Sequence, residues 1–212
     1  MSAVTPYRGR AAAAALFCFF PALCSAQDSI GKPDVKVDDR WIYRRMDHRF
    51  EPPVLFYELR VSFIDSRAIH TVISKQGRPR DSDATFTPEW NGVVAVDEGI
   101  MDVKRGLLQF PLAVGRTYPA LWEMRRPRVG TFHARHERTV KVVGWEEIEV
   151  PAGKFLALKL QAEGRWQRLD RKIGDWARDT VWYVPEVKRW VKRQYEDAQG
   201  KVGEELIFFV VQ

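Results

Sequence analysis

Cysteine is almost absent from the 212-residue sequence, and its two copies, Cys18 and Cys24, both fall near the start of the chain. If that segment is removed, no disulfide, thiolate nucleophile or cysteine ligand for a metal cluster remains. A chain of this length can bury a core large enough to fold without such cross-links. The sequence therefore excludes functions that depend on cysteine chemistry.

Common catalytic and nucleotide-binding motifs are also missing. No serine lies in a nucleophile elbow or begins a Ser-x-x-Lys motif, and no glycine-rich phosphate loop is present. Zinc fingers and the aromatic signature of RNA-binding sheets are absent as well. We therefore expect no identifiable catalytic residue, no cofactor and no nucleic-acid partner.

Long amphipathic helices are lacking too; the best candidate, Gly99 to Leu108, contains Gly106 and fits a strand and loop equally well. Apolar and polar residues instead alternate, as over Tyr57 to Phe63, which is typical of strands with one buried face. Strands are predicted over Trp41–Met46, Tyr57–Phe63, Ala68–Ser74, Gly92–Asp97, Phe132–Val143, Phe155–Gln161, Asp179–Val184, Trp190–Tyr195 and Glu205–Val211.

Short turn signals separate these strands, which favours antiparallel neighbours. The predicted fold class is mainly β: a single antiparallel meander forming a half-open barrel, with a two-sheet β-sandwich as the alternative. The predicted domain spans residues 40–212 and follows a polar, flexible lead-in at residues 27–39.

Residues 1–26 have the features of a secretory signal peptide, with Arg8 and Arg10 before the apolar run from Ala11 to Cys24. That run is too short for a permanent transmembrane span. Cleavage after Ala26 predicts a periplasmic or secreted chain of 186 residues, whose net charge falls from +6 to +4 because two arginines leave. Lipidation at Cys24 is the alternative, disfavoured by the bulky Leu23 before it.

Tryptophan and basic residues are abundant in what remains. All eight tryptophans lie beyond residue 26, where they either fill a β core or line a ligand cavity. One basic cluster consists of Lys188, Arg189, Lys192 and Arg193; such a cluster attracts anions, and the alternative is a solvated strand face. The candidate ligand-binding residues are Trp182, Tyr183, Trp190 and Arg189, with a lipid, lipopolysaccharide or envelope protein as the partner.

Two polar pairs suggest other chemistry. His133 and His136 are three residues apart, so on a strand they point to opposite faces and no metal site is expected. Asp170 and Asp175 could serve an envelope glycan hydrolase only if the fold brings them to the right separation.

Two C-terminal stretches, Glu149–Leu160 with its Pro-Ala-Gly-x-Phe turn and Thr180–Lys192 with Trp-Tyr-x-Pro, carry a family resemblance, as does Gly115–Pro119. They resemble a group of exported bacterial proteins of unknown function, some of which are similar to lipoprotein-carrier-like half-open barrels. The resemblance implies a curved sheet with a concave apolar face and transfers no catalytic residue. The leading hypothesis is a non-enzymatic envelope protein that binds an apolar or amphipathic ligand or a partner; the alternatives are a glycan hydrolase and a structural interaction module.

Overall fold

The computed structural model describes residues 29–49, 54–78, 81–95, 99–126 and 132–212. The predicted signal peptide, the cleavage position after Ala26 and the alternative lipidation site Cys24 lie outside the described residues and stay predictions.

The described chain is built almost entirely from twelve strands and one short 3₁₀ turn, η2, at Pro185–Val187. The first six strands are β1 (Arg40–Asp47), β2 (Val54–Ile64), β3 (Ile69–Lys75), β4 (Ser82–Phe86), β5 (Gly92–Ala95) and β6 (Gly99–Arg105). The remaining strands are β7 (Thr117–Arg126), β8 (Phe132–Val150), β9 (Gly153–Arg168), β10 (Gly174–Val184), β11 (Arg189–Asp197) and β12 (Gly200–Val210).

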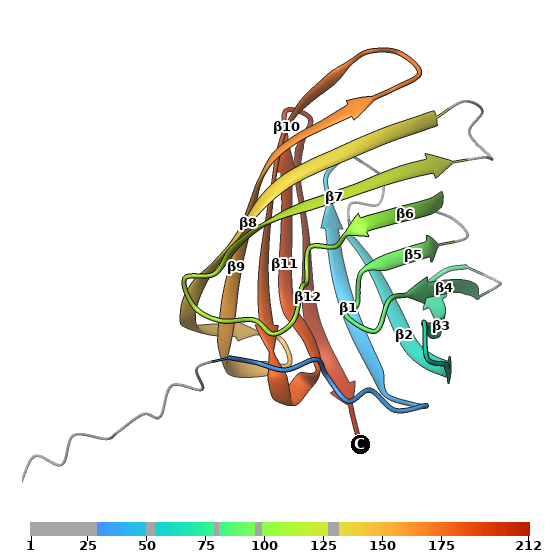
Figure 1. Ribbon diagram of the computed structural model, residues 1–212. Coiled ribbons are helices and arrows are strands. Elements are labelled where there is room, and N and C mark those ends of the chain that lie inside the picture. The colour runs from blue at the N-terminus through green and yellow to red at the C-terminus, as the bar shows by residue number, and fades with distance from the viewer. Residues whose placement is uncertain (1–28, 50–53, 79–80, 96–98, 127–131) are drawn as a thin grey trace, which may run out of the picture.

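All twelve strands belong to one antiparallel sheet, in which each strand pairs with its neighbours in sequence and β12 returns to pair with β1. The predicted single antiparallel meander is confirmed, and the sheet curves into a nearly closed barrel (Figure 1). Its ring of pairing is shortest between β5 and β6, where only Val94 with Ile100 and Ala95 with Gly99 are in register. The alternative of two separate sheets does not describe this strand order.

The two walls of the barrel differ in strand length. β8 and β9 run for 19 and 16 residues, whereas β4 and β5 have 5 and 4. The ambiguous segment from Gly99 is strand β6. β7 was not among the predicted strands, and it tolerates Pro119 because β6 pairs with β7 only as far as Leu121.

The core fills one end of the barrel and extends beyond the strands. Ile30, in the lead-in, exchanges two backbone hydrogen bonds of 2.7 and 2.8 Å with Leu112 and is buried with it. On β9, Leu158 and Leu160 are buried, whereas Leu156 is 49% exposed. Near that end of β9 the neighbouring Phe155 packs towards the core, with its ring 6.2 Å from Phe209.

Candidate functional site

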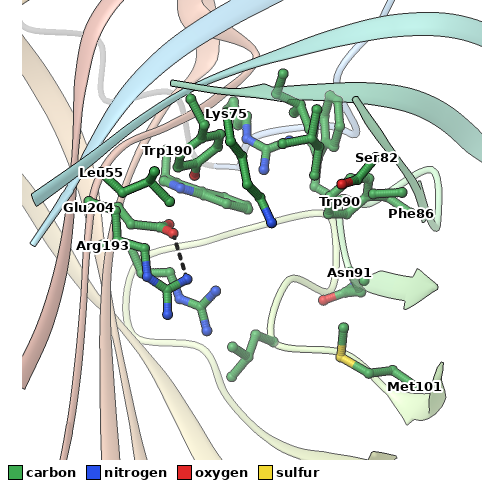
Figure 2. A pocket seen from close by; sticks show the side chains of 18 of the residues that line it. Leu55, Lys75, Ser82, Phe86, Trp90, Asn91, Met101, Trp190, Arg193 and Glu204 are labelled. Carbon is green, nitrogen blue, oxygen red and sulfur yellow. Dashed lines mark ion pairs between the residues drawn. The ribbon is translucent and has the colours of Figure 1, made fainter. Parts of the chain in front are cut away.

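A cavity of about 850 Å³ occupies the barrel beside this packed end. Its lining combines apolar and aromatic side chains, among them Phe86, Trp90 and Met101, with charged groups from facing strands. Figure 2 shows Arg193 and Glu204 on one side of the view and Phe86, Asn91 and Met101 on the other. A volume of this size falls in the range of about 300–1,000 Å³ that small-molecule sites occupy.

Arg189 is the most enclosed charged residue of the cavity lining, with 3% of its surface exposed. Its guanidinium carbon lies 3.9 Å from the centroid of the Trp190 ring and 4.3 Å from that of Trp90. Three further rings surround it within 6 Å, those of Phe86, Tyr43 and Trp41. These five rings form what we call the aromatic cage, and their negative faces attract the cation.

Hydrogen bonds from the cage hold the backbone around Arg189. The indole N–H groups of Trp41 and Trp90 donate to the carbonyls of Val187 and Lys188, both at 2.9 Å. The Tyr43 hydroxyl donates to the carbonyl of Trp190 at 2.7 Å. Residues from β1 and from the β4–β5 connection therefore fix the turn that places Arg189.

The local sequence favours this turn. Pro185 ends the pairing of β10 and starts η2, and Lys188 closes it in a left-handed conformation with φ of 60°. A tight turn of this kind lets β11 begin directly at Arg189.

No carboxylate compensates Arg189 within the described residues. It forms no ion pair there, and its Nε and Nη1 atoms are buried without a hydrogen-bond partner. Burial raises the pKa of the Tyr43 hydroxyl, and the positive charge of Arg189 opposes that rise. A guanidinium buried among aromatic rings, with two nitrogens that have no hydrogen-bond partner, has unused capacity for an anion.

Two other arginines, Arg138 and Arg193, are arranged differently. Asp179 of β10 lies 2.8 Å from Nη2 of Arg193 and 3.6 Å from Nε of Arg138, and the side chains of Asp179 and Arg138 are almost fully buried. Although burial lowers the pKa of Arg193, the Asp179 carboxylate raises it and the net shift is upward. Asp179, Arg138 and Arg193 form what we call the paired cluster.

His136 lies next to the paired cluster, stacked on Trp122 with the rings 5.0 Å apart and nearly parallel. Both of its ring nitrogens are buried without a hydrogen-bond partner. Burial, aided by the charge of Arg138, lowers the pKa of His136 to about 4, so the ring is neutral at pH 7.

The described residues of the cavity lining carry more positive than negative charge. Six basic side chains line it against three acidic ones, a net of +3. The basic residues are Arg45, Lys75, Arg78, Arg126, Arg189 and Arg193, and the acidic residues are Asp47, Asp83 and Glu204. Adding Asp179 and Arg138, which lie behind Arg193, leaves that net charge unchanged.

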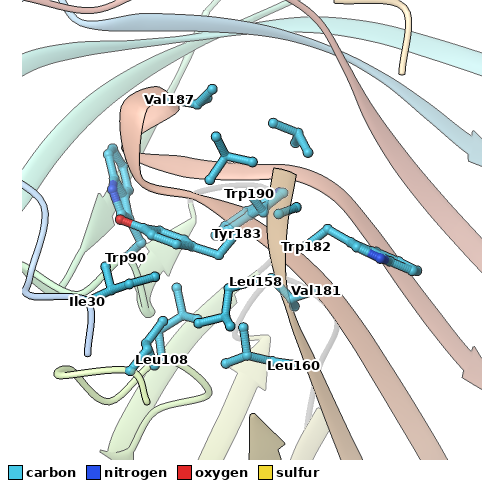
Figure 3. Packing of buried hydrophobic residues seen from close by; sticks show 14 of the residues in the cluster. Ile30, Trp90, Leu108, Leu158, Leu160, Val181, Trp182, Tyr183, Val187 and Trp190 are labelled. Atoms are coloured by element: carbon cyan, nitrogen blue, oxygen red, sulfur yellow. The ribbon is translucent and has the colours of Figure 1, made fainter. Parts of the chain in front are cut away.

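The four candidate ligand-binding residues are separated by the fold. Arg189 and Trp190 line the cavity. Tyr183 is buried in the packed end, where its ring lies 5.5 Å from that of Phe110. Trp182 points the other way along β10 (Figure 3), and it packs on the outer face between Lys159 and Lys192.

Several cavity residues were not singled out by sequence reasoning, notably Lys75, Phe86 and Trp90. Phe86 belongs to β4, a strand of five residues, and Trp90 to the connection that follows it, where it adopts a positive φ of 65°. Neither position stands out in a pattern of alternation.

The other polar pairs do not form a shared site. His136 faces the interior, whereas His133 contacts Glu123 through a 2.8 Å hydrogen bond, so the two histidines occupy opposite faces of β8. Among the described residues no three metal-ligating side chains converge, and no helix there is long and apolar enough to cross a membrane. Asp170 is ion-paired with Arg168, which lowers its pKa to about 2 and makes it unsuited to act as a general acid.

No protein-family model and no curated protein matches this chain. Its fold is similar to that of a proposed lipoprotein from Parabacteroides distasonis, with a TM-score of 0.58 over 87% of this chain and all of the other at 12% identity. Two further solved structures align less closely, a proposed exported protein with a YmcC-like fold from Bacteroides fragilis (TM-score 0.49, 12% identity, 86% and 99% of the two chains) and the hypothetical lipoprotein YmcC from Escherichia coli (TM-score 0.45, 11% identity, 80% and 83%). The first similarity establishes a shared fold and leaves function to be argued from the cavity.

Proposed function

We propose that this protein is a non-enzymatic protein of the bacterial envelope that binds an amphipathic ligand inside its barrel. The observation that carries the proposal is the cavity of about 850 Å³, which joins an apolar, aromatic lining to a few charged groups. Sites that accept small amphipathic molecules have this composition. Export, predicted from residues 1–26, would place the barrel among lipids and other amphiphiles.

Two other functions are less well supported. A structural interaction module would have a filled interior, whereas this barrel encloses a cavity. A glycan hydrolase would need one carboxyl group that stays protonated near neutral pH, and the Asp170 carboxyl group has a lowered pKa.

Uptake of N-phenyl-1-naphthylamine, a neutral apolar fluorophore, tests the proposal directly. We expect the purified protein to bind the probe with a rise in its fluorescence. Leu55 is half-buried in the cavity lining, so Leu55→Trp should fill space there and weaken binding by about tenfold or more.

The matched control is Leu156→Trp, which makes the same substitution at a leucine on the exposed side of β9. It should leave probe binding unchanged. A protein that takes up no probe, or that loses uptake equally with both variants, would contradict a ligand site in the barrel.

A further inference from the structure

The sign of the cavity's charge constrains the ligand more than its volume does. The described lining residues have a net charge of +3, and Arg189 has no carboxylate partner among them. In the paired cluster, by contrast, one buried aspartate serves two arginines. The Arg189 guanidinium is therefore a cavity-side positive charge without a carboxylate partner in the described part of the chain.

Removal from water strengthens the electrostatic interactions of Arg189. Aromatic rings surround the Arg189 guanidinium within 6 Å, so water is largely excluded from it and charge interactions there are stronger than at a surface. Cation–π contacts offset part of the cost of burying the charge but add no negative charge. An anion entering the cavity would supply it.

Lys75 adds a second positive group. It lies at the end of β3, opposite Tyr57 of β2, and Figure 2 shows its side chain extending into the cavity. One part of the apolar lining, with Met101, Val103 and Leu107, comes from β6 and the loop after it. Asn91 fixes that loop, because its side-chain amide exchanges two hydrogen bonds with the Leu108 backbone at 2.8 and 3.0 Å.

We infer that the ligand is an anionic amphiphile: its carboxylate or phosphate head group is bound beside Arg189 and Lys75, and its chain packs against the apolar lining from β6. The inference rests on the proposed function and adds the charge of the ligand and the residues that bind its head group. A cationic amphiphile is excluded by repulsion, and a neutral one gains only from the apolar lining.

A series of ligands with one chain and different head groups tests the inference. Dodecanoate, dodecyl phosphate, dodecanol and dodecylammonium are compared by displacement of the neutral fluorophore, all below their micelle concentrations. We expect the anionic pair to bind at least about tenfold more tightly than dodecanol and dodecylammonium to bind most weakly. The ratio of dodecanoate to dodecyl phosphate distinguishes a carboxylate from a phosphate head group.

Substitutions then locate the head group. Arg189→Gln should remove the anionic preference by about tenfold while probe uptake persists, and Arg189→Lys should retain part of it. The matched control is Arg178→Gln, which removes one positive charge from an exposed ion pair with Glu163. If Arg189→Gln does not fold, Lys75→Gln still tests the site, with an expected loss of about threefold.

The outcomes separate the two proposals. If the probe does not enter, the proposed function fails. If the probe enters but dodecanol binds as well as dodecanoate, the inference about charge is overturned while the cavity function stands. Anionic preference that survives both Arg189→Gln and Lys75→Gln would place the head group elsewhere and overturn the assignment of these residues.

Discussion

The barrel stabilises the charges of its interior arginines in two different ways. In the paired cluster, Arg138 and Arg193 flank Asp179, at 3.6 and 2.8 Å. In the aromatic cage, Arg189 is surrounded by five rings and has no carboxylate among the described residues. Arg138 belongs to β8 and Asp179 to β10, whereas Arg189 and Arg193 both belong to β11.

The difference indicates two roles. A buried charge that is paired and hydrogen-bonded is a structural element, because removing either partner strands the other away from water. A buried cation without a carboxylate keeps its capacity to bind an anion, and its removal leaves no buried carboxylate unpaired. Substitutions in the paired cluster should therefore lower stability more than ligand binding. A substitution of Arg189 should lower ligand binding more than stability.

The largest expected effect is the loss of Asp179. Asp179→Asn leaves the fully buried Arg138 and the partly buried Arg193 without the carboxylate that they share, so we expect the free energy of unfolding to fall by about 3–5 kcal/mol. Chemical denaturation followed by tryptophan fluorescence measures it.

Asp102→Asn serves as the control for that measurement, since Asp102 forms an exposed ion pair with Lys104. It should change stability by less than about 1 kcal/mol. Equal effects of the two substitutions would show that the paired cluster contributes no more than a surface pair.

The next effect is a dependence of stability on pH through His136, which faces Arg138, Asp179, Arg126 and Trp122. Its pKa is about 4 in the folded protein against 6.5 when exposed, so the unfolded chain binds a proton first. The stability that the neutral His136 ring contributes is fully present above pH 6.5 and is lost as the pH falls towards 4. The loss amounts to about 3 kcal/mol at most.

Denaturation at pH 7 and pH 4.5 tests this in the wild type and in His136→Phe, which keeps a ring on Trp122 but cannot titrate. The variant should lose less stability on acidification than the wild type. An identical loss in the two proteins would contradict the assignment to His136.

A smaller loss of stability is expected in the aromatic cage. Arg189→Met keeps an apolar side chain of similar length among the rings and leaves no carboxylate unpaired, so only cation–π attraction is lost, about 0.5–2 kcal/mol. Chemical denaturation of Arg189→Met and Asp179→Asn under the same conditions compares their free energies of unfolding directly. A loss as large as that of Asp179→Asn would mean that Arg189 is a structural residue like Arg193.

The sequence predicted the class and order of this fold because alternation survives in most strands. It predicted less where strands are short or interrupted, as in β4 with five residues and β7 with Pro119. The candidate residues Arg189 and Trp190 could be selected because basic and aromatic residues adjoin there in sequence. Their partners in the cage could not, because Trp41 and Trp90 come from strands and turns far away along the chain.

The register between β10 and β11 decides which of the candidate residues face the barrel interior. Trp182 and Tyr183 are adjacent in sequence and so point to opposite faces of β10, as alternation requires. An irregularity between them then pairs Trp182 with Lys192 and Tyr183 with Trp190. A bulge of this kind leaves no clear signature in the sequence, so which tryptophan reaches the interior could be learned only from the folded barrel.

The smallest expected effect on ligand binding follows from that register. Trp182→Phe changes a ring on the outer face, between Lys159 and Lys192, and should leave the affinity for the fluorophore within about twofold. Trp190→Phe shrinks a ring that lines the cavity and stacks on Arg189, so the same titration should show a clear loss of affinity. Because the two variants remove the same atoms from neighbouring strands, a larger loss for Trp182→Phe would place the ligand outside the barrel.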